Sequence, residues 1–293
     1  MANYLNSIKP FSLFESEQAK PYFVDKSFMI TELLSLIQSG SSYVCITRPR
    51  RFGKTLMASM IAAYLEKNRD SADVFNCLKI SESESYRKHL NAHDVIYIAF
   101  NELPRRCTTY EQYISRIERR LVEDLREAYP DSKFGDDEAV WDYLFHRDFV
   151  TDKDKEAYVE FLSNLLKGQP YVSLAYMTGI LPIAKYSSGS ELNMFLEYTM
   201  ASEEVYSDYF GFTETEVDDI YNRFLRVKKE PKVEREGLRI WYDGYHTKSG
   251  ERVYNPRSVV ASLTNNNLGS YWTNSGPYEH LLKPRQENMP LLP

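Results

Sequence analysis

The fold is decided by the stretch YVCITRPRRFGKTLMASMIAAYL, residues 43–65. Its first five residues, 43–47, are short, mainly apolar and rich in aromatic and β-branched side chains, which predicts a buried strand. After the loop 48–53, apolar side chains fall on one continuous stripe at helical spacing, which predicts a helix. The stripe consists of Leu56, Met57, Met60, Ile61, Tyr64 and Leu65. The expected order is therefore a strand, a basic loop and a helix.

The loop and the first helical residues, RPRRFGKT at 48–55, have the pattern of a phosphate-binding loop. Backbone N–H groups of such a loop and of the first helical turn point at one place, where the helix dipole favours an anion. Gly53 permits close backbone approach, Lys54 is expected to reach the β- and γ-phosphates, and Thr55 is expected to ligate Mg²⁺. Arg48 replaces the first glycine of the pattern GxxxxGK[ST]. A basic exposed loop without a ligand stays open as an alternative.

Strands and helices alternate on both sides of this loop. Helices are expected over residues 28–38, 111–128 and 155–166, and buried strands over 95–100 and 171–177. Alternation of this kind favours an α/β fold, with a P-loop NTPase-like parallel sheet and flanking helices.

The second part of the chain has a different pattern. Residues 191–230 are acidic and predicted helical, with a capping box at Thr213 and Glu216. The short aromatic segments that follow are interpreted as a smaller α/β or winged-helix-like unit. We therefore expect a nucleotide-binding domain at 1–190 and a helical and winged-helix-like region at 191–293.

Composition excludes several classes of protein. The chain has 293 residues, which suggests roughly two domains. Its net charge of −6 disfavours a general nucleic-acid coat. No apolar run approaches the roughly 20 residues that span a bilayer, and the N-terminus lacks the pattern of a secretion signal. The 3 cysteines lack CxxC spacing, and the 5 histidines are scattered. We expect reduced thiols, a cytoplasmic protein, and neither a membrane segment nor a metal cluster.

Taken together, the motifs resemble the predicted AAA-ATPase-like family of bacterial proteins. The resemblance starts with RPRRFGKT, preceded by YFVDKS at 22–27. Further blocks follow in order: LFHRDFVTDKDKEAYVEFLSNLLKG (144–168), YMTGILPIAKYSSGSELNMF (176–195), WYDGYH (241–246), VYNPRSVV (253–260) and YWTNSGPYE (271–279). It implies a P-loop ATPase domain that uses ATP or another nucleoside triphosphate with Mg²⁺. Longer members often carry a C-terminal PD-(D/E)xK nuclease-like domain, which is not expected in this chain.

The resemblance also assigns residues to the site. The nucleotide would be bound by Arg48, Pro49, Arg50, Arg51, Phe52, Gly53, Lys54 and Thr55, with Thr55 on Mg²⁺. Thr178, just past a predicted strand, would take a sensor-like place near the γ-phosphate. The lead-in segment 22–26 would lie close to the nucleotide. Arg48 counts as the family's own variant of the first loop position.

One expected element departs from the family pattern. An acidic pair should precede the FHRDF block, to hold the Mg²⁺ water shell and to orient the attacking water. Ala139 and Val140 stand at those positions, whereas Asp142 matches. Asp142 is therefore the remaining acidic candidate, with Asp137 and Glu138 as substitutes. We expect nucleotide binding rather than efficient hydrolysis.

Three functions stay open at this point. The first is an ATPase that uses hydrolysis as a conformational switch, with Lys54, Asp142 and Thr178 as catalytic candidates. The second is a non-hydrolysing module in which ATP and Mg²⁺ only order an interface. The third is a nucleic-acid or protein adaptor that uses the basic loop without nucleotide, which the negative net charge disfavours for nucleic acid. A protein partner or self-association is compatible with each.

Overall fold

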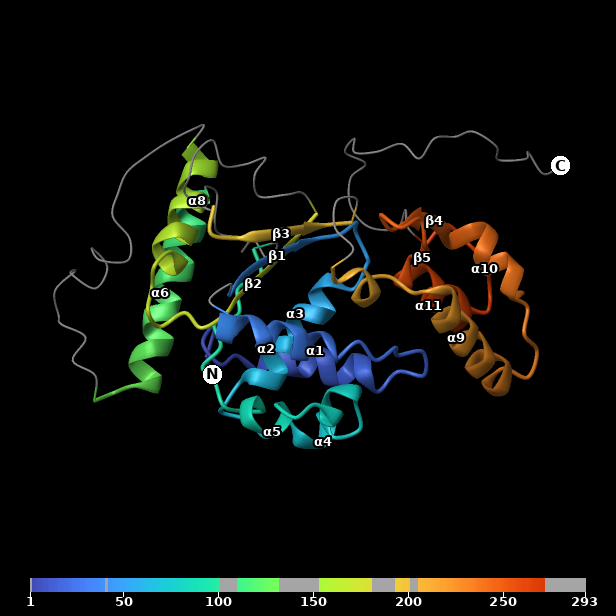
Figure 1. The fold of residues 1–293 in the computed structure, drawn as a ribbon, viewed down its shortest axis with the longest axis horizontal. Coiled ribbons are helices and arrows are strands. Elements are labelled where there is room, and N and C mark those ends of the chain that lie inside the picture. Colours follow the sequence, from blue (N-terminus) through green and yellow to red (C-terminus); the bar gives the residue numbers. More distant parts are fainter. Residues whose placement is uncertain are drawn as a thin grey trace.

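The computed structural model describes residues 2–39, 42–100, 110–131, 153–180, 193–200 and 205–271. At its centre lies a three-stranded parallel sheet in the order β2-β1-β3 (Figure 1). The strands are β1 (Tyr43–Thr47), β2 (Ala175–Gly179) and β3 (Leu196–Thr199). Because all three run in the same direction, their carboxyl ends meet at one edge of the sheet.

Helices cover both faces of this sheet. On one side lie α1 (Ile8–Gln18), α2 (Met29–Ser39) and α3 (Lys54–Leu65). The short helices α4 (Ala72–Phe75), η1 (Lys79–Glu82) and α5 (Tyr86–His89) belong to the same side, and α4 and α5 lie farther from the sheet in Figure 1. The other side is packed by α6 (Tyr110–Ala128) and α8 (Lys153–Leu166). Val44 and Ile46 belong to the first core, and Cys45 between them belongs to the second. Strand side chains alternate between faces, so β1 contributes to both cores.

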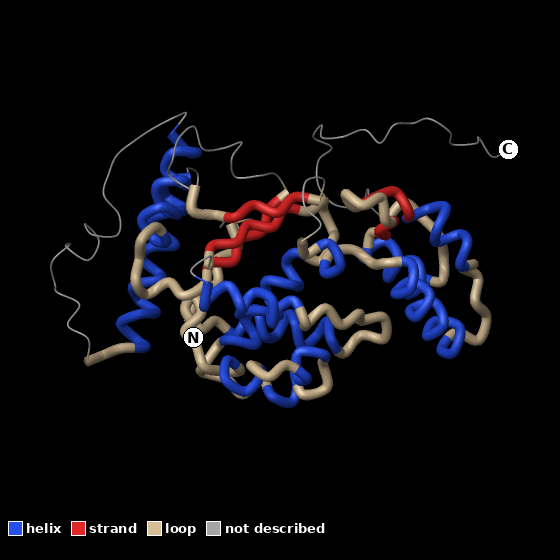
Figure 2. Tube along the Cα trace, in the orientation of Figure 1, coloured by secondary structure: helices blue, strands red, loops and turns tan. Residues whose placement is uncertain are grey.

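The C-terminal part has a core of its own. It contains η3 (Ser207–Tyr209), α9 (Glu214–Val227), α10 (Arg235–Tyr242), the antiparallel pair β4 (Asp243–His246) and β5 (Arg252–Tyr254), and α11 (Pro256–Asn265). The core includes Val217, Phe224, Leu238 and Leu263. In Figure 2 these elements lie beside the sheet, with the short β4–β5 strands red among helices.

Most of the predicted elements are confirmed. The strand at 43–47 and the helices over 28–38, 111–128 and 155–166 correspond to β1, α2, α6 and α8. The predicted strand at 171–177 starts later, at Ala175, because the preceding residues form a turn, and it ends later, at Gly179, because Thr178 and Gly179 still pair with β1. Thr178 therefore lies within the strand and not just past it. The capping box is also confirmed, since the Thr213 hydroxyl accepts from the Glu216 N–H and the Glu216 carboxylate accepts from the Thr213 N–H.

Two predicted elements are wrong. Residues 95–100 form no sheet strand; Ile96 makes only an isolated antiparallel bridge with Leu5 and is 39% exposed. The Asn6 side chain accepts from the Val95 N–H at 2.8 Å, and main-chain bonds join Asn6 to Val95 and Tyr97 to Tyr4. This run therefore pairs briefly with the N-terminal segment and not with the sheet.

The second error concerns the segment expected to be helical over 191–230. Its residues 196–199 are β3, which pairs with β1 in parallel. The sheet therefore includes residues on the C-terminal side of position 190, and the division into 1–190 and 191–293 stays a prediction.

Candidate functional site

The loop that follows β1 leaves the sheet through a turn in left-handed backbone conformations. The Arg48 N–H still donates to the Gly179 carbonyl of β2, at 3.2 Å, one residue beyond β1. Arg51 then has a φ of 71° and Gly53 a φ of 85°. A positive φ is strained for residues with a Cβ and easy for glycine. The sequence GK at the start of α3 thus places its glycine where the backbone requires one.

Lys54 points back into this loop. Its ammonium donates to the carbonyls of Arg48 at 2.8 Å and Pro49 at 2.7 Å. Burial, together with the positive charges of Arg50 and Arg48, lowers the pKa of Lys54 to about 8. Among the described residues, no carboxylate acts on this ammonium. The loop therefore concentrates positive charge that a bound anion would balance.

The N-terminus of α3 adds backbone donors to the same place. Its N-cap is Gly53, which has no side chain to satisfy them. The first N–H groups of a helix, here those of Lys54, Thr55 and Leu56, have no acceptor within the helix. The first bond back to the cap is that of the Met57 N–H to the Gly53 carbonyl, at 2.8 Å. A helix N-terminus with free N–H groups is suited to an anion such as phosphate.

The residues present also suit a magnesium ion held with a nucleotide. Thr55 is exposed in the first turn of α3, where its hydroxyl is accessible. Mg²⁺ usually keeps several waters and takes one or two protein oxygens together with substrate phosphates. Within the described ranges no group of three or more His, Cys, Asp or Glu side chains could hold a metal ion. Thr55 would provide one protein oxygen to such an ion, beside the phosphate oxygens of a bound nucleotide.

Arg48 has an interior position. Its side chain is 2% exposed and donates to the carbonyls of Thr47 at 2.9 Å, Tyr198 at 3.0 Å and Val205 at 3.5 Å. The guanidinium carbon also lies 5.2 Å from the centre of the Phe210 ring. Burial lowers its pKa to about 10, a value at which it is still charged at neutral pH. Arg48 thus contributes its main chain to the loop, while its side chain joins β1 to β3 and to the segment after it.

The outer side of the loop is packed by the C-terminal part, which the sequence reasoning missed. The Asn255 amide donates to the Arg50 carbonyl at 3.3 Å. Phe52 is buried and meets the Tyr245 ring edge-on, with centroids 4.7 Å apart. The Arg51 guanidinium donates to the carbonyl of Tyr271. WYDGYH and VYNPRSVV, noted only as sequence blocks, contain two of these partners.

Thr178 lies at the carboxyl end of β2, opposite Ile46 of β1. Its hydroxyl donates to the Ile46 carbonyl at 2.9 Å. The structure thus brings Thr178 to the sheet edge that carries the loop, with its hydroxyl bonded to the central strand. Asp142, with Ala139 and Val140, lies outside the described residues.

The lead-in segment 22–26 contacts the C-terminal part. Tyr22 belongs to the core around α9. Lys26 forms an ion pair with Glu216 at 2.5 Å and donates to the Asp208 carbonyl. Burial lowers the pKa of Lys26, although Glu216 acts in the opposite direction. These contacts join the lead-in to α9, and its expected closeness to a nucleotide stays a prediction.

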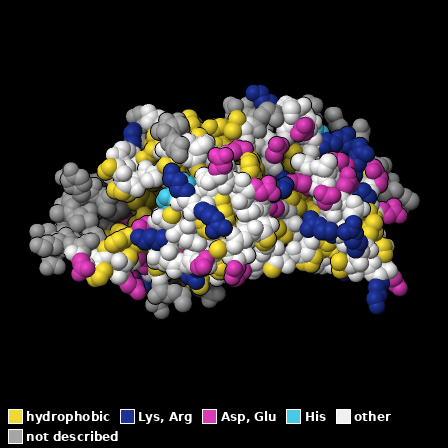
Figure 3. Space-filling view, turned by 60° about the horizontal axis from the view of Figure 1, so that its bottom comes forward, with side chains coloured by type: hydrophobic (Ala, Val, Ile, Leu, Met, Phe, Trp, Pro, Cys, Tyr) yellow, Lys and Arg dark blue, Asp and Glu magenta, His cyan; other side chains and the backbone are white. Residues whose placement is uncertain are grey.

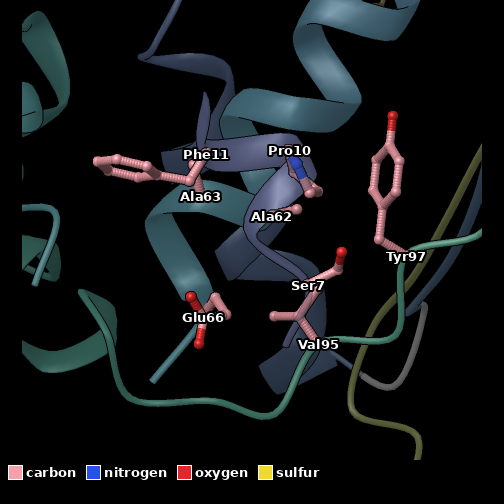
Figure 4. Close-up of a pocket in the computed structure, with 8 residues that line it drawn as sticks. All are labelled: Ser7, Pro10, Phe11, Ala62, Ala63, Glu66, Val95 and Tyr97. Atoms are coloured by element: carbon pink, nitrogen blue, oxygen red, sulfur yellow. The ribbon is translucent and has the colours of Figure 1, made fainter. Parts of the chain in front are cut away.

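A crevice on the α1–α3 side carries no ligand site. It is lined by Ser7, Pro10, Phe11, Ala62, Ala63, Glu66, Val95 and Tyr97 (Figure 4). It leaves no room for a water molecule. On the face that Figure 3 shows, the described Lys and Arg side chains are interspersed with Asp and Glu. None of the described helices is long and apolar enough to cross a membrane.

The comparisons agree with the family resemblance. Residues 7–144 match the family model described as Predicted AAA-ATPase, a range that contains β1, the loop and α3. This supports an AAA-ATPase-like family and confirms the resemblance.

A curated relative from Azotobacter chroococcum mcd 1 is 26% identical over 282 residues, covering 87% of this chain and 51% of its own length. It is described as an uncharacterized protein in the vnfD 5′ region. The chain therefore spans about half the length of this relative. No solved structure gives a significant match.

Proposed function

We propose that the chain binds ATP together with Mg²⁺ in the loop 48–55. The observation that carries the proposal is the position of Lys54. Its ammonium lies inside the loop on two main-chain carbonyls, and its charged neighbours among the described residues are arginines. A lysine ammonium that lies near arginines and beside a helix N-terminus is suited to bind a polyanion such as a triphosphate.

Each loop residue then has a role. Lys54 contacts the β- and γ-phosphates, and the N–H groups at the start of α3 bind phosphate oxygens. Thr55 contributes its hydroxyl to Mg²⁺, which would neutralise phosphate charge. Gly53 gives the turn its left-handed conformation, and Arg48 fixes the start of the loop from the protein interior.

The proposal also covers the fold and the location of the protein. The sheet and its helices form a P-loop NTPase-like domain in which β1, the loop and α3 bind the nucleotide. Two helices followed by the β4–β5 hairpin favour a winged-helix-like region. The free thiols of Cys45 and Cys77 favour a reducing compartment, the cytoplasm.

Hydrolysis is expected to be slow. Ala139 and Val140 stand where the family has an acidic pair, and a positioned base contributes about 10²–10⁴ in rate. Phosphate release at saturating ATP and Mg²⁺ measures this directly. Turnover that falls sharply in Asp142→Asn would instead identify an active ATPase with that residue as its acid.

Calorimetric titration with Mg-ATP tests the binding. We expect Lys54→Ala to weaken the affinity roughly tenfold to a hundredfold, the loss typical of a charge-assisted hydrogen bond. The exposed Lys88 of α5 provides the control, because Lys88→Ala removes the same charge away from the loop. Equal affinity in the wild type and in Lys54→Ala would contradict the proposal. Salt-sensitive DNA or RNA binding that survives Lys54→Ala would favour the adaptor function instead.

A further inference from the structure

The loop 48–53 is held from outside by residues that are distant in the sequence. Asn255 and Tyr245 come from the segment that contains β4, β5 and α11, about two hundred positions after the loop. Asn255 bonds the Arg50 carbonyl, and Tyr245 packs on Phe52. The two contacts lie on either side of Arg51, whose φ of 71° is unfavourable for a residue with a side chain. Such a conformation persists when the surroundings over-determine it.

Phe52 is fixed by packing as well. It is 1% exposed, and it lies so close to Gly211 that a Cβ there would be 3.1 Å from its ring. The same Cβ would be 2.0 Å from the side chain of Val253 in β5. The Phe52 ring is therefore enclosed between Gly211 and Tyr245. A loop residue enclosed in this way cannot turn without moving the C-terminal part.

We propose that Tyr245 and Asn255 are positioning residues for phosphate binding, which hold the loop 50–53 in its anion-binding conformation. The inference rests on the proposed function, because it says that the C-terminal part holds the proposed ATP site in shape before ATP binds. A loop that is already ordered loses less entropy when it binds its ligand, so its affinity is higher. Neither residue touches the phosphates; each acts through the main chain or the ring of a loop residue.

Two variants separate positioning from folding. Tyr245→Ala removes the ring from Phe52, whereas Tyr245→Phe keeps it. Asn255 is also the N-cap of α11, where its side-chain oxygen accepts from the Ser258 N–H at 3.2 Å. Asn255→Ser keeps a good capping oxygen but is too short to donate to the Arg50 carbonyl. Tyr171→Ala is the matched control, since Tyr171 is 56% exposed and its hydroxyl donates to the Leu165 carbonyl in the last turn of α8.

The experiment has an arm without nucleotide and an arm with it, both on the full chain. In the first, amide hydrogen exchange of residues 48–56 should be faster in Tyr245→Ala and Asn255→Ser than in the wild type. Tyr245→Phe and Tyr171→Ala should leave it unchanged. In the second, the first two variants should bind Mg-ATP about three- to tenfold more weakly, with unchanged circular dichroism.

The outcomes are distinguishable from those of the proposed function. Unchanged exchange in Tyr245→Ala and Asn255→Ser would overturn the inference, whether or not ATP binds. Faster exchange with unchanged Mg-ATP affinity would also overturn it, because the contacts would then have no effect on the ligand. If the wild type binds no ATP, the proposed function fails, and faster exchange in the nucleotide-free arm still establishes that the two residues hold the loop.

Discussion

Lys54 illustrates how burial sets the chemistry of one side chain. The carbonyls of Arg48 and Pro49 hold its ammonium, but the loop removes much of its water and surrounds it with positive charge. The protonated form is therefore less stable here than in solution, and the pKa falls from 10.5 to about 8. Phosphate binds the protonated form, so the negative charge of a bound phosphate should raise the pKa of Lys54 again.

We expect the affinity for Mg-ATP to fall as pH rises through 8. Lys54 is protonated below its pKa of about 8 and neutral above it, so the charge that attracts phosphate is lost on the alkaline side. Between pH 7 and pH 9 the dissociation constant should rise about tenfold. Calorimetry over this range measures the change. Lys54→Arg should abolish the pH dependence, because an arginine stays charged throughout; a slope that persists in Lys54→Arg would assign the effect to another group.

Arg48→Met should destabilise the protein by about 2–4 kcal/mol. The methionine keeps an apolar stem but leaves carbonyls of Thr47 and Tyr198 without the donor that the buried guanidinium supplies. Chemical denaturation with two spectroscopic probes measures the free energy of unfolding. Arg50→Ala is the control in the same loop, since the Arg50 side chain is exposed and little change is expected. Similar stabilities for both variants would contradict the interior role of Arg48.

At the scale of elements, the backbone between β3 and β5 depends on a glycine. Gly211 has a φ of 86°, and the Phe212 N–H that follows donates to the Tyr254 carbonyl of β5 at 3.1 Å. Gly250, in the β4–β5 turn, has the same φ, but a Cβ there would meet nothing within 4 Å. An alanine at Gly250 would therefore add only backbone strain, whereas an alanine at Gly211 would add the same strain and a steric overlap.

Gly211→Ala should cost clearly more stability than Gly250→Ala. We expect about 1 kcal/mol for Gly250→Ala, from the positive φ alone. In Gly211→Ala the overlap with Val253 should bring the loss to about 3 kcal/mol or more. Denaturant titration of both variants measures the difference. Equal losses would mean that β5 shifts without resistance, and the packing around Phe52 would then be loose.

The elements near the loop were predictable because local pattern determines them. The apolar run 43–47, the GK pair and the helical stripe after it contain the information for β1, the turn and α3. The strand 196–199 was not predictable in this way. It is short, and only pairing with β1 makes it a strand. Residues 95–100 are the opposite case. Their composition favours a strand, but Ile96 forms only an isolated bridge with Leu5, so they do not join the sheet.

The candidate site was predictable only in part, for a similar reason. Lys54 and Thr55 carry a motif, whereas the partners that hold the loop carry none. Asn255 and Tyr245 resemble ordinary residues of a turn and a hairpin until the fold brings them to Arg50 and Phe52. The motif places Arg48 among the nucleotide-binding residues of the loop, although its side chain donates to carbonyls of β3 and Val205 in the interior.

At the scale of the whole molecule, the described C-terminal part contacts the rest of the chain in several regions. One is the loop. Another is the lead-in segment with the residue before it, where the Arg223 guanidinium donates to the carbonyls of Pro21 and Phe23. A further contact joins η3 to α2, where the Tyr209 hydroxyl donates to the Glu32 carboxylate. A ligand that orders the loop should therefore also order the C-terminal part that contacts it. Because coupling free energy is reciprocal, ordering of the C-terminal part should likewise strengthen ligand binding.

Mg-ATP should slow amide exchange in residues 243–265 as well as in the loop. Because Asn255 and Tyr245 contact the loop, ordering the loop should also order β4, β5 and the start of α11. Exchange followed by mass spectrometry, with and without Mg-ATP, measures this. Lys54→Ala should abolish the protection in both regions. Protection of the loop alone would show that the C-terminal part does not respond to the nucleotide.

The parallel sheet also has a consequence for the order in which the chain can fold during synthesis. β1 emerges early from the ribosome, but its neighbours β2 and β3 are made only after α6 and α8. The Val205 carbonyl that receives Arg48 comes later still. Until β2 is made, β1 has both edges unpaired, and until β3 is made one edge stays unpaired; unpaired strand edges can associate wrongly. The helices α1 to α5 can pack on one face of β1 during this interval. The N-terminal helices can thus bury the apolar side chains of that face before the other strands are made.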